Sequence, residues 1–409
     1  MKRSKPWVTV LFCIALALWC AGTFTAQRAG DMARSVSARW ADGGVSPAQL
    51  IKQEEYAKQD GVQNRPELTL WDESPAGQIS DNGGRTAEAA AIELFGKGEE
   101  ICFEELLAGG FPARGDTDGC AISEKTAFDL WGSRDVLGKT VLINGSIHSV
   151  RGVFRGSEGL VLMQRDGSGT KSFPRMQLRF RDGGGPAEAE AFLIRAGFSG
   201  AALLDLPLLG WFVKALAGLP AVILGMGILI KLLCRGARLR PFPLLLSGYM
   251  LPAGVAGALC LHLMGFPWSV PQRLIPTKWS DFEFWGRTLG DFAKSVKGCL
   301  SAAPTRWDMS FWPNLLLTAL LVMGTAVLLA AAMGRIKIKT GRGLIIGCLC
   351  SAGTMLLTAI LLVPYGGLGM DGGMWLMPWL WLGVDYGLYL HETYLGSKTG
   401  KGQNTKDED

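Results

Sequence analysis

The chain has 409 residues, of which 48% are hydrophobic, and its formal net charge at pH 7 is +5. That length would allow two or three soluble domains, but the apolar content and a mean hydropathy of +0.22 indicate a membrane protein. The basic residues concentrate in short loops between apolar stretches, so the positive charge does not indicate a nucleic-acid partner.

The N-terminal segment predicts a membrane anchor over residues 1–26. Trp7 to Thr25 carries no charged residue and follows three basic residues, and at about 1.5 Å per residue it is long enough to cross a bilayer. Small residues near its end also fit a cleaved signal peptide. The length of the run, with Trp19 near its far end, favours a retained anchor.

Residues 27–205 predict one α+β domain, with helices and strands in mixed order. The patterns favour a helix from Ser46-Pro47 to about Gln59, strands at Glu67–Trp71 and Met176–Arg181, and a helix from Pro186 to about Ala196. Thr86 to Phe95 fits either a helix or a strand.

Cys120 to Phe154 contains a string that resembles a phosphate-binding loop. Such a loop needs G-x-x-x-x-G-K-[ST], and Gly138-Lys139-Thr140 would require its first glycine at Ser133, whereas the glycine is at 132. The same residues predict a helix capped by Ser123 and running through Trp131. A strand from Lys139 to Ile143 follows, and then an Asn144-Gly145 hairpin turn.

We expect no catalytic residues, no metal site and no bound cofactor. The chain has no C-x-x-C pair, no H-E-x-x-H motif and no nucleophile elbow, and its three histidines are few for a metal site. Cys102 and Cys120 are both expected outside the membrane and could form a disulfide. Cys299 would be a third cysteine on that side, which would leave one thiol over.

The second half of the chain predicts a five-span transmembrane domain over residues 206–391. The apolar stretches are about Lys214–Leu233, Pro243–Met264, Leu315–Met333, Gly343–Val363 and Met374–Leu390. With the anchor, the chain would form an all-α bundle of about six spans, and the α+β domain would be inserted between the first and second.

Basic loops predict the orientation of these spans, because short cytoplasmic loops carry an excess of Lys and Arg. The two most basic loops contain Lys231, Arg235, Arg238 and Arg240, and Arg335, Lys337, Lys339 and Arg342. Both termini, including the polar tail 392–409, would then be cytoplasmic in a multi-pass plasma-membrane protein, with residues 27–205 outside. Arg235, Arg238 and Arg240 could contact a cytoplasmic ATPase, or they could only set the topology.

The outer loop 265–312 predicts an amphipathic helix over about 281–298. Ser280 and Glu283 fit a capping box at its start. The apolar residues recur every three or four positions, at Phe282, Trp285, Leu289, Phe292, Val296 and Leu300. We expect this helix to lie on the outer membrane interface or beneath the outer domain.

Asp385 lies within the last predicted span, where an ionised carboxylate is costly unless it is paired or hydrated. It is a candidate polar intramembrane site. The sequence permits a proton- or ion-linked role and also a paired, structural one.

Several short motifs in the outer domain occur in a recognisable order. They are Gly109-Gly110-Phe111-Pro112, a loop with Asp116, Cys120-Ala-Ile-Ser-Glu-Lys125, Leu130-Trp-Gly132, Leu137-Gly-Lys-Thr140, Ile143-Asn-Gly145 and Val150-Arg-Gly-Val153. This order resembles the MacB-like periplasmic core domain of permease subunits in the FtsX-like class of ABC transporters. In such permeases one span precedes the outer domain and the others follow it.

The resemblance implies a permease subunit that works as a dimer with a separate cytoplasmic ABC-type ATPase, and that drives export or outer conformational work. Two features depart from the family pattern: five spans follow the outer domain where three are common, and only about residues 234–242 are available for a coupling helix. The alternative function is a non-transporting, membrane-anchored sensor or scaffold whose outer domain binds a partner.

Overall fold

The computed structural model describes residues 6–59, 65–181, 184–239, 241, 243–264, 270–271, 274–276, 278, 280–301, 305–362 and 373–403. The chain divides into two compact units. The helical unit comprises Met1–Gln27, Trp211–Ser269 and Pro313–Asp409, and the sheet unit comprises Arg28–Gly210 and Val270–Trp312.

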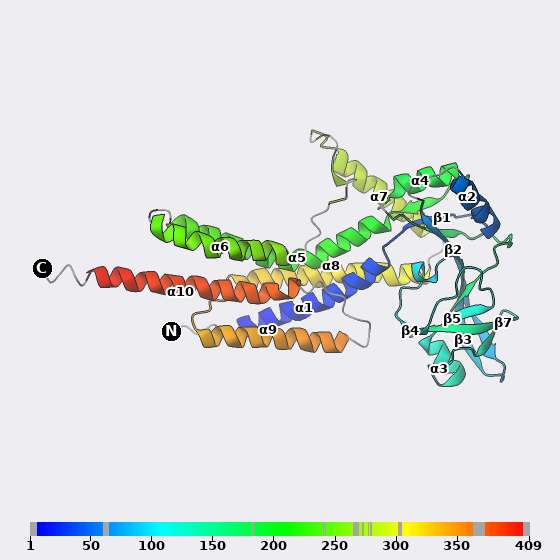
Figure 1. Cartoon of the computed structure of the whole chain (residues 1–409), viewed down its shortest axis with the longest axis horizontal. Helices are drawn as coiled ribbons and strands as arrows, with labels where there is room; N and C mark the ends of the chain where they lie inside the picture. The colour runs from blue at the N-terminus through cyan, green and yellow to red at the C-terminus, as the bar shows by residue number, and fades with distance from the viewer. Residues whose placement is uncertain are drawn as a thin grey trace. The chain divides into compact units, whose positions relative to one another are not determined.

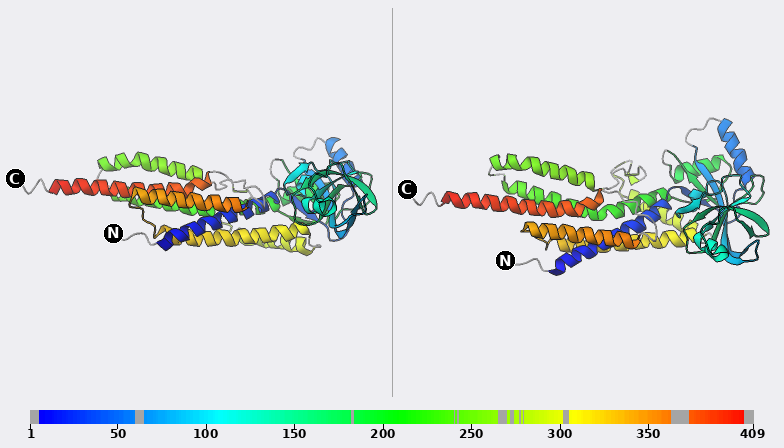
Figure 2. Two further views of the ribbon diagram at one scale, coloured as in Figure 1. Left: turned by 90° about the horizontal axis from the view of Figure 1, so that it is seen from below. Right: turned by 60° about the horizontal axis from the view of Figure 1, so that its bottom comes forward.

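Long helices make up the helical unit (Figures 1 and 2). They are α1 (Pro6–Asp31), α5 (Leu206–Leu239), α6 (Pro243–Leu263), α8 (Arg306–Met333), α9 (Gly341–Leu362) and α10 (Met377–Gln403), with the short 3-10 helix η4 (Met374–Leu376) before α10. The boundary between the two units falls inside α1, α5 and α8.

Five of the described helices are long and apolar enough to cross a membrane: Trp7–Asp31, Leu206–Leu239, Leu245–Leu263, Asp308–Met333 and Gly341–Leu362. They match the anchor and four of the five later predicted spans. The last predicted span coincides with η4 and α10, which are helical but are not among these five. The total of six spans therefore stays a prediction.

The core of the helical unit is built around two buried tryptophans, Trp19 of α1 and Trp381 of α10. The Trp19 indole N–H donates to the carbonyl oxygen of Ala217 in α5 at 3.0 Å. Leu224 and Ile228 of α5 are fully buried in the same cluster. The first helix thus packs against later helices of the chain mainly through apolar side chains, with buried hydrogen bonds from Trp19 to Ala217 and from Thr318 of α8 to Thr25.

The sheet unit contains one ten-stranded mixed sheet, in the order β10-β1-β9-β2-β3-β8-β5-β7-β4, with β6 pairing β2 and β7. The strands are β1 (Val36–Arg39), β2 (Glu67–Asp81), β3 (Thr86–Phe95), β4 (Leu106–Gly109), β5 (Gly119–Ser123), β6 (Thr140–Ile143), β7 (Ser146–Phe154), β8 (Leu160–Gln164), β9 (Arg175–Arg179) and β10 (Ala202–Leu204). The predicted α+β class is confirmed for this unit, since strands and helices alternate irregularly along it.

Helices cover the sheet in two places. Near β1, β9 and β2, buried side chains of α2 (Pro47–Gln59) and α4 (Pro186–Arg195), including Leu50 and Leu193, form one core. Around β5, β7 and β8, α3 (Glu124–Trp131) contributes Ala127 and Leu130 to a second core. The unit is completed by the 3-10 helix η1 (Gly98–Glu100) and by α7 (Phe284–Ser301).

The local predictions for Cys120–Phe154 are confirmed. Ser123 caps α3 by accepting a hydrogen bond from the Thr126 N–H, and Gly132 ends the helix with a φ of 66°. Asn144 and Gly145 have φ values of 51° and 83°, the left-handed pair that a tight hairpin requires. Lys139 points its ammonium group at the Trp131 ring, 5.5 Å from the centroid, rather than into a phosphate-binding loop.

Other predicted elements differ in extent. The strand predicted at Glu67–Trp71 continues to Asp81, and the ambiguous segment Thr86–Phe95 is a strand. β3 is central in the sheet, between β2 and β8, and its small alanines are nearly all buried there. Tertiary pairing has therefore overridden the helical preference of alanine.

The amphipathic helix is present, but it begins at Phe284, four residues after Ser280, so the predicted capping box does not open it. The Phe284 N–H instead donates to the carbonyl oxygen of Asp281. The compact sheet unit also includes Val270–Trp312, which the sequence had placed in the loop of the transmembrane domain.

Candidate functional site

The sheet unit includes one end of each of three candidate membrane helices: the C-terminal end of α1 and the N-terminal ends of α5 and α8. α1 ends at Asp31, four residues before β1, and β10 ends one residue before α5. β1 and β10 pair antiparallel at one edge of the sheet, with Ser37 opposite Leu204. The first turn of α5 is capped by Asp205, which accepts the Leu208 N–H at 3.0 Å. Short connections of this kind leave little slack between the strands and the helices.

The first turn of α8 is attached to β1 by a buried ion pair. The Arg39 guanidinium donates two parallel hydrogen bonds to the carboxylate of Asp308, at 2.8 and 3.0 Å. Arg39 is 1% exposed and Asp308 4%. A two-point contact of this geometry fixes both orientation and distance, and it excludes water.

Asp308 also completes the N-terminus of α8. Its carboxylate accepts the N–H and the hydroxyl of Thr305, while the Thr305 hydroxyl accepts the Asp308 N–H at 3.3 Å. This reciprocal arrangement is a capping box, in which side chains satisfy the free N–H groups of the first turn. One carboxylate therefore both starts the helix and bonds it to the sheet.

A second set of contacts holds the neighbouring residue, Arg306. Its backbone N–H and its Nε both lie 3.0 Å from carboxylate oxygens of Glu73 in β2. Its Nη1 lies 2.6 Å from Glu158, in the loop before β8. We call Arg39, Glu73, Arg306 and Asp308 the junction. These side chains attach the start of a candidate span to two separate strands of one sheet.

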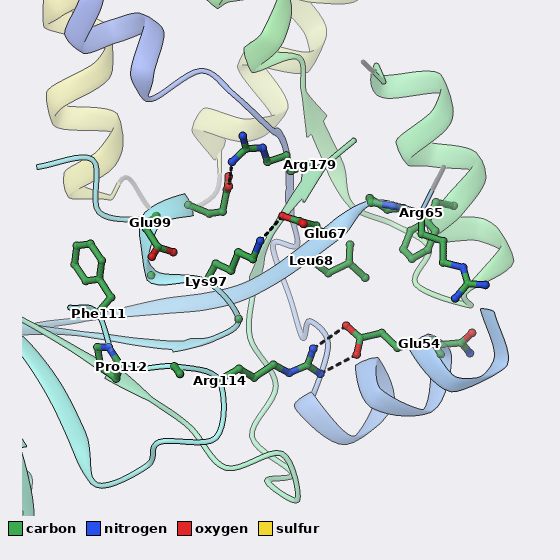
Figure 3. A pocket seen from close by; sticks show the side chains of 17 residues that line it. Glu54, Arg65, Glu67, Leu68, Lys97, Glu99, Phe111, Pro112, Arg114 and Arg179 are labelled. Atoms are coloured by element: carbon green, nitrogen blue, oxygen red, sulfur yellow. Dashed lines mark hydrogen bonds and ion pairs between the residues drawn. The ribbon is translucent and has the colours of Figure 1, made fainter. Parts of the chain in front are cut away.

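The sheet unit also contains a pocket of about 890 Å³, shown in Figure 3. It is lined by residues of α2, β2, η1, the loop 111–114, β9 and α4. Its lining includes acidic, basic and apolar side chains. The acidic ones are Glu54, Glu67, Glu99 and Glu100, the basic ones are Arg65, Lys97, Arg114 and Arg179, and the apolar ones include Leu68, Phe111, Pro112 and Phe192.

Most charges in this pocket are already paired with one another. Arg114 lies 2.9 Å from Glu54 by two contacts, and Lys97 lies 2.7 Å from Glu67. The hydrogen bond from Lys97 holds the pKa of Glu67 below its usual value. The pocket has both charge signs and an apolar wall, so its chemistry suits a mixed polar and apolar ligand better than a simple anion.

The predicted ATPase-coupling arginines have different surroundings in the helical unit. Arg235 binds Glu392 of α10 at 3.0 Å and lies 3.2 Å from the His391 ring nitrogen. Arg238 is exposed. Arg240 lies outside the described residues. Because α5 runs to Leu239 and α6 starts at Pro243, three residues are left between them for a coupling element.

A second basic segment, 334–340 between α8 and α9, is the better exposed of the two. Arg335, Lys337 and Lys339 are exposed, whereas Ile338 is buried in the core of the helical unit. The Ile338 N–H donates to Asp385 of α10 at 3.0 Å. The buried Ile338 therefore anchors a short segment whose neighbouring lysines remain exposed.

Asp385 is engaged at both of its carboxylate oxygens. One accepts the Ile338 N–H, and the other lies 2.5 Å from the ammonium of Lys231 in α5. Lys231 also lies 4.4 Å from the centroid of the Trp381 ring. The arrangement compensates the carboxylate charge within the helical unit, as a structural ion pair requires. A proton-linked role stays a prediction.

Cys102 and Cys120 are both buried free thiols, so the predicted disulfide is not formed in this structure. Cys120 lies inside β5 between β7 and β8, and Cys102 follows η1. Within the described part of the chain, no group of three or more His, Cys, Asp or Glu side chains is placed to hold a metal ion.

Sequence reasoning missed the junction. Arg39 is the last residue of the short strand β1. Thr305 to Asp308 fits the spacing of a capping box, which was a usable signal for the start of α8. Nothing in the sequence pairs residue 39 with residue 308, because 269 positions separate them. The junction is visible only once the sheet is formed.

Comparison with known proteins returned no matching family model and no matching curated protein. Two solved structures are similar to part of the chain. The periplasmic region of MacB from Actinobacillus actinomycetemcomitans is 12% identical with a TM-score of 0.35, and the match covers 42% of this chain and 89% of that chain. The extracellular domain of the noncanonic ABC-type transporter YknZ from Gram-positive bacteria is 14% identical with a TM-score of 0.29, over 38% and 88% of the two chains. The motif order at residues 109–154 resembles the same MacB-like class of domain that the first of these structures represents.

Proposed function

We propose that this chain is a permease-type membrane subunit that transmits the work of a separate cytoplasmic ABC-type ATPase to its sheet unit. It would operate as a dimer, and its own role would be mechanical rather than catalytic. The observation that carries the proposal is the junction, together with the short connections from α1 and to α5. One end of each of three apolar helices is joined to strands of one sheet, either by a short connection or by the junction.

The junction supports a mechanical role because it makes the attachment of α8 to the sheet stiff. A helix transmits displacement along its axis when its end is fixed, and a buried two-point ion pair fixes an end more firmly than an exposed one. The motif resemblance supplies the expectation of an ATPase partner. The exposed cations Arg238, Lys337 and Lys339 are the side chains we assign to ATPase contact, by charge attraction to an acidic surface.

The test is ATP hydrolysis by an ABC-type ATPase from the same organism, reconstituted in nanodiscs with and without the full-length protein. We expect hydrolysis to depend on the chain. The Arg39→Met variant should lower it severalfold while still co-purifying with the ATPase, because the carboxylate of Asp308 loses its partner and the start of α8 is released.

The matched control is Arg151→Ala. Arg151 also forms an ion pair in the sheet unit, with Asp116 at 3.1 Å, but that pair is exposed and lies away from α8. The Arg151→Ala variant should leave ATP hydrolysis unchanged. If the ATPase neither binds the chain nor responds to it, the proposal is wrong. Equal loss in both variants would indicate general damage to the fold instead of lost transmission.

The pocket favours a second candidate function, in which the sheet unit binds a partner as a sensor or scaffold. Its volume of about 890 Å³ and its mixture of charges and apolar side chains would accept a short peptide segment. Affinity capture of binding partners by the full-length protein, compared with capture by an Arg114→Glu variant, would test this second function. Arg114→Glu places two carboxylates together at Glu54, so binding at this pocket should be lost.

A further inference from the structure

The amphipathic helix α7 has a narrow apolar stripe. At about 100° per residue, Trp285, Leu289, Phe292 and Val296 fall within an arc of about 60°. The charged residues of the helix lie on the other side: Arg287, Asp291, Lys294 and Lys297. A stripe of this kind normally marks the side of a helix that is covered.

Only part of this stripe is covered: Phe292 and Val296 are half-buried, whereas Trp285 and Leu289 are exposed. Thr288, Ser295 and Gly298 are also half-buried, and they lie about 70° to 150° around the helix from the centre of the stripe. Gly298 is the position in contact with β10, where an added Cβ would lie 3.4 Å from the Ala202 side chain. Trp285 remains 49% exposed and Leu289 63% exposed.

The residues just before α7 also include an exposed apolar side chain. Phe282, just before the helix, is 91% exposed, the largest value among the exposed large apolar side chains in the described residues. A soluble domain rarely leaves phenylalanine, tryptophan and leucine open to water within eight residues of one another.

Chain connections favour a lipid surface as the occupant. α6, which precedes α7, and α8, which follows it, are both candidate membrane spans. α7 ends at Ser301 and α8 begins at Arg306, and a stretch this short reaches at most about 17 Å. The C-terminal end of α7 is therefore tethered close to the N-terminal end of a helix that could span the membrane.

We propose that α7 is an interfacial helix whose apolar stripe lies in the outer surface of the lipid bilayer. Trp285, Leu289 and the preceding Phe282 enter the boundary between headgroups and acyl chains, and Lys294 and Lys297 face the headgroups and water. The side of α7 with Gly298 packs on β10, so the proposed lipid contact and the sheet contact use different sides of the helix.

The experiment places a fluorescent coumarin amino acid at position 289 of the full-length protein in nanodiscs of phosphatidylcholine and phosphatidylglycerol. Lipids brominated on their acyl chains quench a fluorophore that reaches them. We expect severalfold quenching at position 289. The same probe at position 294, on the charged side of the helix, is the matched control and should be quenched little.

Unequal quenching of this kind supports the proposal, and equal or absent quenching at position 289 overturns it. A photo-crosslinking residue at 289 gives an independent readout: a lipid adduct supports the proposal, and a covalent dimer overturns it by showing that a second copy covers the stripe. If the 289 variants do not fold, position 282 serves for both measurements. None of these results depends on an ATPase, so a failure here leaves the proposed function standing.

Discussion

Cys102 and Cys120 have little contact with solvent, and burial raises the pKa of each thiol to about 12. The reactive species is the thiolate, so both residues should resist alkylation at pH 7.5 in the native full-length protein. Exposed Cys234 is the internal control and should react readily. Mass spectrometry of peptides after timed alkylation measures all three. Modification of Cys120 as fast as Cys234 would show that β5 opens frequently.

His148 predicts a pH dependence for the sheet unit. Desolvation by burial lowers its pKa, and its Nδ1 is buried without a hydrogen-bond partner. The folded-state pKa therefore lies below the unfolded value of about 6.5, so the unfolded chain binds the proton more readily. The stability that His148 contributes is present above about pH 6.5 and is lost as the pH falls through the folded-state pKa.

Thermal unfolding of the full-length protein between pH 7.5 and 5 measures this effect. The wild-type midpoint should fall over that range, and a His148→Leu variant should fall less, because leucine binds no proton. Glu67 does not interfere over this range. The hydrogen bond from Lys97 lowers the pKa of Glu67, so the stability that Glu67 contributes is lost only at more acidic pH, below about 4.5. Identical slopes in both proteins over pH 7.5 to 5 would rule out His148 as the source.

At the scale of elements, two glycines explain motifs that carry the family resemblance. Gly152 lies in β7 where a Cβ would come within 2.4 Å of the Gly110 carbonyl oxygen, and Gly109 has a φ of 70° beside the Arg151 backbone. β4 and β7 can pair this closely only because side chains are missing there. The motifs are therefore requirements of strand packing.

Gly152→Ala should destabilise the sheet unit strongly, by about 3 kcal/mol or more, because backbone atoms would have to move. Gly110→Ala is the matched control: it is in the same contact, yet its own Cβ would meet nothing within 4 Å, so it should be nearly neutral. Unfolding midpoints and proteolysis rates of the two full-length variants give the comparison. Equal stability would show that β4 is not held against β7.

At the scale of the whole molecule, Asp385 holds together three separate parts of the helical unit: α5 through Lys231, the 334–340 segment through Ile338, and α10, to which it belongs. Replacing one partner leaves the other charge uncompensated within the bundle. Asp385→Leu or Lys231→Met alone should each cost about 1–3 kcal/mol.

The double variant should recover part of that loss, since neither charge remains. Thermal midpoints of the four proteins in nanodiscs form the complete cycle. Additive losses in the double variant would show that the two side chains act independently and that the ion pair contributes nothing to stability.

Much of the chain could be predicted from the sequence. Apolar runs and basic loops are local patterns, and they predicted the anchor and four of the later helices that the structure contains. Ser123, Asn144 and Gly145 act on their own neighbours, so the α3 cap and the β6–β7 hairpin were predicted correctly. Backbone preference and hydropathy are enough wherever the deciding contacts lie within a few residues.

Tertiary structure decided everything that depends on distant partners. β3 became a strand because β2 and β8 lie on both sides of it, and Cys102 and Cys120 are buried as free thiols. The pairing of Arg39 with Asp308 joins residues far apart in the chain, and so does that of Lys231 with Asp385. A carboxylate has the same local signature whether it faces water or a buried cation. The sequence by itself determined the long apolar helices and the local turns, whereas the charge partners that join residues far apart in the chain were decided only by folding.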